Sequence, residues 1–301
     1  MATMTEPTID NALLAHLQTW QGQSETLGDT LTAVPVAALS ATLDRDDPAP
    51  AAGTALPPLW HWLYFLPHAR QSEIGPDGHP QRGGFLPPVP LPRRMWAGGR
   101  LRWEIQSDGA NPLRVGQEVQ RTSTIASVKH KAGRSGELLF VLVQHQFSNG
   151  SGLALTEEHD IVYRSAAQPG DPAPAPQKPP LDGQAAWSRT IVPDDVLLFR
   201  YSALTFNGHR IHYDRKYVTE VEGYPGLIVH GPLIATLLLD LLRRSLPGAQ
   251  VATFDFRAVR PTFDLHSFSV HGKPSADGKT VELWAQDHEG WLTMQGTATL
   301  A

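Results

Sequence analysis

The segment 233–245 constrains the fold more than any other, because its apolar side chains are not confined to one face. On a helix they would cover nearly the whole circumference, and a helix that is apolar all round is buried. Gly231 and Pro232 precede the segment and Pro247-Gly248 follow it, which is typical of a helix start and a helix end. We therefore predict a central helix enclosed by the rest of the chain. Its apolar positions are Leu233, Ile234, Leu237, Leu238, Leu239, Leu241 and Leu242.

Segments with the composition of β-strands, separated by glycine-containing turns, lie on both sides of this helix in the sequence. They predict an α+β fold in which an antiparallel sheet wraps the central helix. Shorter helices are predicted at 9–20, 35–43 and 195–203, and irregular structure at 44–58 and 75–92. Trp60, Trp62, Tyr64 and Phe65 lie between the two irregular segments and are expected to be buried. The predicted strands are 117–128, 137–147, 153–164, 187–191, 252–259, 267–272, 280–286 and 291–300.

A proline-rich segment divides the chain into two parts of related size. Residues 166–184 contain six prolines and no aromatic residue, which is typical of an extended linker. We therefore predict an N-terminal part, 1–165, with a helical extension at its start, and a C-terminal part, 185–301. The central helix and the polar cluster described below both fall in the C-terminal part.

Composition excludes several classes of function. The chain has no cysteine, so disulfides, thiolate metal sites and a cysteine nucleophile are absent. Its net charge is −5 at pH 7, so no overall basic field favours nucleic acid or an anionic membrane. No run of 18 apolar residues predicts a membrane span, and the first residues lack the pattern of a secretory signal. We expect a cytoplasmic protein with no nucleic-acid or membrane partner.

Three polar side chains crowd a short stretch before the central helix. Asn207, His209 and His212 fall within six positions, and His230-Gly231 marks the start of the helix. A general acid or base must be held within hydrogen-bond reach of its substrate. A backbone N–H at a helix start can donate to a developing oxyanion, and glycine lets a carbonyl approach closely. The pattern predicts a base and an oxyanion hole, which suits enolate chemistry beside a carbonyl.

Alternative interpretations of the cluster are weaker. One histidine alone more often has a structural role, so the prediction rests on the whole cluster rather than on His212. The spacing of His209 and His212 resembles part of a metal site, but no carboxylate or third histidine lies at a suitable spacing. We expect no metal and no redox cofactor. The motifs of serine hydrolases, P-loop NTPases and dinucleotide-binding enzymes are absent.

The cluster resembles the motif of a known enzyme family. The order of a polar residue, Ile-His and, about eighteen residues later, His-Gly is similar to that in MaoC-like (R)-specific enoyl-CoA hydratases. The strings YSALTFNGHRIHYD and YPGLIVHGPL, with LPRRMWAGG upstream and FDFRAVRP downstream, resemble one branch more closely. That branch contains mesaconyl-C4-CoA (3-methylfumaryl-CoA) hydratases, itaconyl-CoA hydratases and type 2 hydroxyacyl-thioester dehydratases. The resemblance runs from about Leu91 to the C-terminus and is most specific in 199–235.

The resemblance implies a fold and a set of site residues. The fold would be a double hot dog, in which two antiparallel sheets each wrap a helix, with the first half as a degenerate copy. His212 falls on the catalytic histidine, and Gly231 on the residue whose N–H binds the thioester oxygen. Asn207 falls where the wider family has its catalytic aspartate, and His209 where it has asparagine. An amide orients water but cannot take up and release protons as a carboxyl group does.

Because of that difference, the second proton transfer is left open. Either His212 carries both protons, as a syn addition permits, or another group assists it. The supporting residues considered are His209, Asp214, Tyr201 and His230, although Asp214 also suits the cap of a helix at 215–221. A free carboxylate on the substrate requires a cation, and arginine is the natural partner. The arginines considered for that carboxylate or for CoA phosphates are Arg93, Arg94, Arg210, Arg257 and Arg260.

The implied activity is reversible addition of water to a 2-enoyl-CoA thioester. The first expectation for the substrate is mesaconyl-C4-CoA, which gives citramalyl-CoA. Itaconyl-CoA comes second, and a 3-hydroxyacyl thioester of fatty-acid synthesis third. A hot-dog thioesterase or a non-catalytic acyl-CoA-binding module would fit the same fold, but a base beside an oxyanion hole argues against a pure binder. CoA would be the carrier of the substrate. Homo-oligomerisation is possible for the fold.

Overall fold

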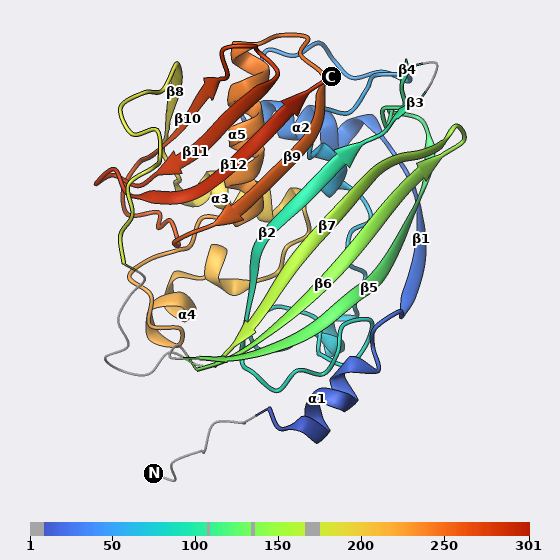
Figure 1. Cartoon of the computed structure of the whole chain (residues 1–301), viewed down its shortest axis with the longest axis vertical. Coiled ribbons are helices and arrows are strands. Elements are labelled where there is room, and N and C mark those ends of the chain that lie inside the picture. The colour runs from blue at the N-terminus through green and yellow to red at the C-terminus, as the bar shows by residue number, and fades with distance from the viewer. Residues whose placement is uncertain (1–8, 107–108, 134–135, 166–174) are drawn as a thin grey trace.

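A computed structural model describes residues 9–106, 109–133, 136–165 and 175–301, and one antiparallel sheet of ten strands dominates it (Figure 1). The strands follow the order β1, β5, β6, β7, β2, β9, β12, β11, β10 and β8, and each neighbouring pair is antiparallel. The first five come from residues before the proline-rich segment and the last five from residues after it. Their bounds are β1 Ser24–Thr30, β2 Arg93–Trp103, β5 Glu118–Gly133, β6 Gly136–Asn149, β7 Gly152–Arg164, β8 Trp187–Ile191, β9 Val251–Ala258, β10 Phe268–Pro274, β11 Thr280–Gln286 and β12 Leu292–Leu300.

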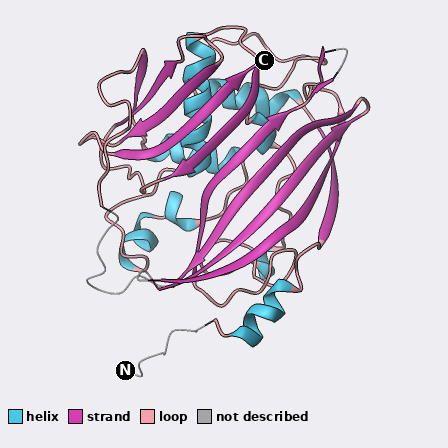
Figure 2. Ribbon diagram, in the orientation of Figure 1, coloured by secondary structure: helices cyan, strands magenta, loops and turns pink. Residues whose placement is uncertain are grey.

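Helices α2, α3 and α5 lie together on one side of this sheet, whereas α1 lies at its lower end (Figure 2). The helices are α1 Asn11–Gln18, α2 Ala33–Thr42, α3 Asp195–Leu204, α4 Arg215–Glu220 and α5 Gly231–Ser245. Short 3-10 helices are η1 Trp60–Leu63, η2 Gln71–Glu73 and η3 Arg210–His212, and a small separate hairpin joins β3 Ile105–Gln106 to β4 Gly109–Ala110. Among the residues that the structure describes, no helix is both long and apolar enough to cross a membrane.

The two sets of strands meet where β2 pairs with β9. Glycines make this close pairing possible. A Cβ on Gly98 would collide with the carbonyl oxygen of Phe256, and one on Gly99 would lie 3.1 Å from the Phe256 ring. Neither position has room for a side chain, so the Gly98-Gly99 pair lets Phe256 pack directly across the joint. The register of β2 against β7 shifts between Trp96 and Gly98, which is a β-bulge at the same place.

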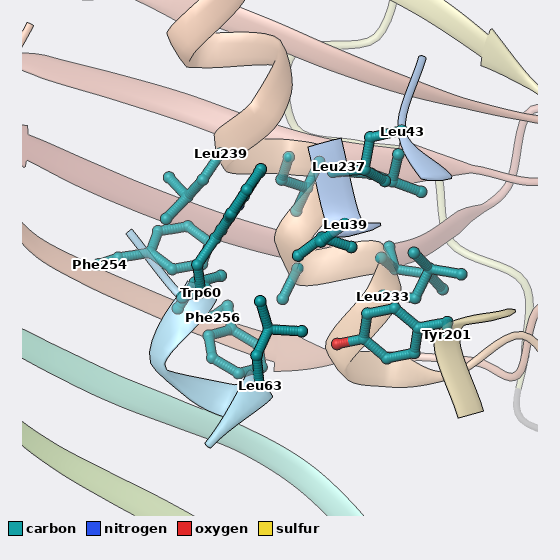
Figure 3. Packing of buried hydrophobic residues seen from close by; sticks show 14 of the residues in the cluster. Leu39, Leu43, Trp60, Leu63, Tyr201, Leu233, Leu237, Leu239, Phe254 and Phe256 are labelled. Atoms are coloured by element: carbon teal, nitrogen blue, oxygen red, sulfur yellow. The ribbon is translucent and has the colours of Figure 1, made fainter. Parts of the chain in front are cut away.

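Helix α5 is buried around its whole circumference, as its sequence predicts. Every residue from Leu233 to Leu242 is buried, and the helix packs against β8, β10, β11 and β12. Figure 3 shows Leu233, Leu237 and Leu239 of α5 with residues of α2, η1 and β9. The core therefore joins both sets of strands through one cluster. The other labelled members are Leu39, Leu43, Trp60, Leu63, Tyr201, Phe254 and Phe256.

A buried ion cluster fixes the far end of α5. The carboxylate of Asp240 pairs with Arg45 at 2.6 Å, Arg189 at 3.0 Å and Arg244 at 2.7 Å. Arg45 follows α2, Arg189 lies in β8 and Arg244 lies in α5 itself, so one carboxylate ties two other parts of the chain to the central helix. Removing one member of such a buried set leaves the others charged and unpaired, which is costly. The cluster therefore holds α5 in one orientation and with it the N-terminal end of the helix.

Most predicted elements are confirmed, with some corrections. Strand β1 was not predicted, because its sequence SETLGDT is polar and it lies at the sheet edge. Strand β2 begins at Arg93 and not near Leu101, and the helix predicted from 35 begins at Ala33. Of the aromatic cluster, Trp60, Tyr64 and Phe65 are buried, whereas Trp62 is half-buried.

The second half of the predicted linker packs on the C-terminal strands. The first half, 166–174, lies outside the described residues. Beyond it, the carbonyl of Gln177 accepts a hydrogen bond from Leu292, and Asp182 accepts one from the Gln286 amide. Residues 175–184 therefore run against the ends of β11 and β12. The division of the chain at 166–184 into two domains stays a prediction.

Candidate active site

Three histidines lie in contact at the N-terminal end of α5. His212 ends η3 and stacks on His230, with ring centroids 3.8 Å apart and planes 18° apart. His209 precedes η3 and meets His212 edge to face, with centroids 5.4 Å apart. His230 is the residue immediately before α5, so the short turn and the helix start bring side chains from two parts of the motif together. The predicted cluster is thus assembled in space.

Backbone contacts set the orientation of His212. Its Nδ1 donates to the carbonyl oxygen of Ile228 at 2.7 Å, and Ile228 N in turn donates to the carbonyl of Ile211. The proton on Nδ1 leaves Nε2 as the basic nitrogen of a neutral ring. Burial lowers the pKa of His212 to about 4, and the nearby His79 lowers it too. At neutral pH the ring is therefore uncharged and able to accept a proton.

His230 is fully buried behind His212. Its Nε2 lies 2.8 Å from the hydroxyl oxygen of Ser202 in α3, and its Nδ1 has no hydrogen-bond partner among the described residues. The ring of Tyr201 packs on it with centroids 5.1 Å apart. Burial holds the pKa of His230 well below its usual value and raises the pKa of Tyr201. Both side chains are therefore uncharged. The His230 ring stacks on His212, and the Tyr201 ring packs on His230.

Gly231 supplies an N–H that is free of the helix ladder. It is the first residue of α5, and the first N–H groups of a helix have no acceptor within it. The partial positive charge of the helix start favours a negative oxygen at this point. A Cβ on Gly231 would meet only the end of the Met294 side chain, at 3.9 Å. Within the protein, the space beside Gly231 is thus bounded only loosely, by the end of one flexible side chain.

Asn207 organises the loop rather than contacting His212. Its side-chain oxygen accepts a hydrogen bond from the backbone N–H of His209 at 3.0 Å, and its own backbone N–H donates to Ser202 O. No hydrogen bond between Asn207 and His212 is present in the described structure. Asp214 is also occupied: one oxygen accepts from Tyr217 N and the other from Arg210. The helix-cap interpretation of Asp214 is the one that fits.

A loop from the first part of the chain completes the cluster. Asp77 accepts hydrogen bonds from the His79 backbone N–H and from its Nδ1, both at 3.0 Å, and the His79 ring lies 4.0 Å from the ring of His209. The loop is docked by backbone contacts. Arg210 N donates to Asp77 O, and a Cβ on Gly78 would overlap Gly208 O.

Sequence reasoning missed Asp77 and His79. They lie in GPDGHP, within a segment that was expected only to be irregular. The turn residues give a physical reason for a loop but no sign of where it docks. The one signal was an aspartate and a histidine two positions apart in that loop.

Three of these side chains have an arrangement that can bind a cation. Asp77, His79 and His209 each offer a ligand atom within 4.8 Å of the others. Two of those groups are already joined, because His79 Nδ1 donates to Asp77 Oδ2. A metal ion would compete with that bond, so the pair is better described as a carboxylate that fixes the tautomer of His79, with Nε2 as its free nitrogen. The expectation of no metal stays a prediction.

A polar pocket lies against β2, β5, β6 and β7. It has a volume of about 190 Å³, and Thr205 lines it two residues before Asn207. Two residues span at most about 7 Å of chain, so Asn207 lies within that distance of the pocket lining. Its charged groups include Arg121 and the buried Glu157, which accepts hydrogen bonds from Trp62 and His61, each at 3.0 Å. All of its lining residues except Thr205 come from the first part of the chain.

The five predicted arginines have different surroundings. Arg93 donates to the Tyr224 hydroxyl and the Glu222 carbonyl, and Arg210 pairs with Asp214 at 2.7 Å. Arg260 lies 3.6 Å from Asp287. Arg257 is exposed and alternates with the buried Phe254 and Phe256, so it points away from the core. Arg94 pairs with no carboxylate in the described part of the chain.

The chain is similar to a family model and to known enzymes along most of its length. A family model described as hydroxyacyl-thioester dehydratase type 2 matches residues 59–264. The mesaconyl-C(4)-CoA hydratase of Chloroflexus aurantiacus is 47% identical over 289 residues, covering 95% of this chain and 98% of that protein. The mitochondrial hydroxyacyl-thioester dehydratase type 2 of Schizosaccharomyces pombe is 28% identical, covering 79% of this chain and 86% of that protein.

A solved structure confirms the fold. A conserved Mycobacterium tuberculosis protein with a double hotdog fold aligns with a TM-score of 0.56 at 15% identity, covering 96% of this chain and 98% of its own. At that identity the likeness concerns the fold alone. The double hot-dog expectation is thus confirmed.

Proposed function

Since the chain belongs to the hydroxyacyl-thioester dehydratase type 2 family, we propose that it is a hydro-lyase that adds water reversibly to mesaconyl-C4-CoA and forms citramalyl-CoA. The likeness to the Chloroflexus hydratase along nearly the whole chain is the observation that carries this choice. Two further substrates fit the same chemistry: itaconyl-CoA, and the 3-hydroxyacyl thioesters to which the name of the more distant relatives points.

In the proposed reaction, His212 and Gly231 act on opposite ends of the reacting system. The Gly231 N–H donates to the thioester oxygen and stabilises the charge that develops there. Nε2 of His212 takes a proton from water as the water oxygen bonds to Cβ, and the π electrons move toward the thioester oxygen. The enolate then collapses and takes the proton from Nε2 at Cα. Atoms and charge balance with one histidine, and no resident cofactor is required.

The single-histidine route is supported by what surrounds His212. The oxygens of Asp214 are held by the α4 cap and by Arg210. Burial raises the pKa of Tyr201, and its ring packs behind His230. Neither group is suited to donate a proton at Cα. His209 remains beside His212, and we propose for Asn207 the role of holding the loop that carries both.

The activity is tested with a panel of thioesters. We expect rapid loss of enoyl-thioester absorbance with mesaconyl-C4-CoA, and slower or no loss with itaconyl-CoA, crotonyl-CoA and a long-chain 2-enoyl-CoA. Free thiol is followed in parallel with a disulfide reagent and should stay constant. Turnover of the monocarboxylic chains alone would assign the protein to fatty-acid dehydration, and thiol release would assign it to the thioesterases.

Gly231→Ala tests the oxyanion site separately. The added methyl group meets only Met294 at 3.9 Å within the protein, so stability should change by less than about 0.5 kcal/mol. The same methyl group would stand where the thioester oxygen approaches. We expect kcat/KM to fall by at least about tenfold, which corresponds to about 1.4 kcal/mol of transition-state stabilisation. Unchanged kinetics in a folded variant would remove Gly231 from the site.

Several expectations stay predictions. We propose a cytoplasmic location and CoA as the carrier of the acyl group, and these rest on the bacterial hydratase relative. Homo-oligomerisation and the domain division at 166–184 remain open to measurement by sedimentation and by limited proteolysis.

A further inference from the structure

The proposed substrate places a strict demand on the site. In mesaconyl-C4-CoA the free carboxylate is bonded to Cβ, the carbon that water attacks. Its receptor must therefore lie beside the catalytic histidines and not at a distance along an acyl tunnel. A carboxylate brought into a largely buried site also needs a positive partner, and arginine can hold both oxygens at once. The structure has to offer a cation close to His209 and His212.

Arg94 lies on the inner face of the sheet at the required place. It pairs across the strands with Tyr163, whose side chain is completely buried. Side chains alternate along a strand, so Arg94 shares its face with Trp96, whose ring lies 4.2 Å from that of His159 in the polar pocket. Arg94 itself is half-buried. Arg94 acts electrostatically on His159 of the polar pocket and on His79 and His209, so it lies within reach of both groups.

The electrostatic surroundings agree with this position. Burial lowers the pKa values of His209 to about 2 and of His159 to about 3, and the charge of Arg94 adds to the lowering in both. Burial and Arg94 also lower the pKa of His79. These three histidines are therefore neutral at pH 7, whereas Arg94 and Arg82, which also acts on His79, carry a positive charge. The guanidinium of Arg82 is already held by the backbone carbonyls of Val89, Leu91 and Pro92.

The other arginines are engaged elsewhere or turned outward. Arg93, Arg210 and Arg260 face acidic partners, and Arg257 is on the outer side of β9. Arg121 is the rival, because it lines the polar pocket. It is nearer to negative charge, however: Glu25 lies 3.9 Å away, and Glu157 and Asp29 also act on it. Arg94 has no carboxylate partner within the described ranges.

We propose that Arg94 binds the free carboxylate of the acyl group and so selects dicarboxylyl thioesters over monocarboxylic ones. This inference rests on the proposed function, because it assumes a substrate with a carboxylate on Cβ. The carboxylate would be held beside Trp96, with Cβ toward His212 and the thioester oxygen toward Gly231. Arg94 would then be a specificity-determining residue that fixes which face of the double bond meets the water.

The test measures recognition without turnover. Succinyl-CoA and butyryl-CoA have the same number of acyl carbons, differ in the terminal carboxylate and contain no double bond to hydrate. Their dissociation constants are measured by calorimetry for the wild-type chain and for Arg94→Gln and Arg94→Lys. A hydrogen-bonded charge pair contributes about 1.5–3 kcal/mol, so Arg94→Gln should weaken succinyl-CoA binding by about 10- to 150-fold. Butyryl-CoA binding should change less than about twofold, and Arg94→Lys should recover part of the loss.

Two matched variants make the result decisive. Arg100→Gln removes a guanidinium from the same strand, but Arg100 is exposed and pairs with Glu158 and Asp160, so it should leave both affinities unchanged. Arg121→Gln tests the rival. Equal losses for both ligands in Arg94→Gln, or a selective loss in Arg121→Gln alone, would overturn the proposal. Because neither ligand is hydrated, this outcome is independent of the thioester panel that tests the reaction itself.

Discussion

Replacing His212 by asparagine should abolish most hydratase activity while leaving the fold intact. The side-chain amide of asparagine can donate to Ile228 O as Nδ1 of His212 does at 2.7 Å. What the exchange removes is the Nε2 lone pair. A positioned general base contributes about 10²- to 10⁴-fold, so kcat should fall by that factor. Steady-state kinetics with mesaconyl-C4-CoA measure the loss, and near-ultraviolet circular dichroism checks the fold.

The control comes from a second stacked histidine pair. His266 and His288 stack with centroids 3.8 Å apart, close to the distance between His212 and His230, but His266 is exposed and lies outside the site. His266→Asn should keep wild-type kcat. Binding of butyryl-CoA should survive in His212→Asn, since the base is not needed for affinity. Retention of more than about one tenth of kcat in His212→Asn would show that another group performs the proton transfer.

The elements that could be predicted are those in which the spacing of apolar residues shows which side chains are buried. Helix α5 could be assigned because its leucines cover all faces, and β5 to β7 because apolar residues alternate between glycine turns. Strand β1 was not predicted, because a polar edge strand has no apolar pattern. The start of β2 was not predicted either, because Pro90, Pro92 and the glycines of WAGG suggest irregular structure. Its strand geometry comes from pairing with both β7 and β9.

The active site was predictable only where its residues are close in sequence. The stretch 207–212 and His230-Gly231 could be joined because a short segment links them. The docking of the Asp77 loop depends on the contact of Gly78 with Gly208, 130 positions apart, and no periodicity encodes such a contact. Likewise, the sequence offered five arginines without ranking them. The ranking came from ion pairs such as Arg210 with Asp214, which require coordinates.

The site makes acid instability an intrinsic property of this protein. Burial lowers the pKa values of His145 and His212 to about 4, of His159 to about 3 and of His209 to about 2. In the unfolded chain a histidine titrates near 6.5. As the pH falls below that value, these histidines bind protons in the unfolded chain but stay unprotonated in the folded protein. The free energy of unfolding therefore decreases with falling pH, by up to about 1.4 kcal/mol per pH unit for each histidine.

The position of the transition separates the histidines from the carboxylates. Although burial raises the pKa of Glu157, the hydrogen bond from His61 and the neighbouring histidines bring it down to about 2. A lowered carboxyl pKa contributes stability that is lost only as the pH falls below about 4.5. Loss of stability that begins between pH 6.5 and 5 must therefore come from the buried histidines.

Urea unfolding measured from pH 7.5 to 5 should show this proton uptake. These four histidines alone should make the free energy of unfolding fall by about 5 kcal/mol per pH unit near pH 5, a large part of the stability of a typical domain. His159→Asn should reduce the slope by about one proton, whereas His266→Asn, at an exposed histidine, controls for the exchange itself. A free energy of unfolding that is flat down to pH 5 would contradict the neutral, buried histidine cluster on which the proposed base depends.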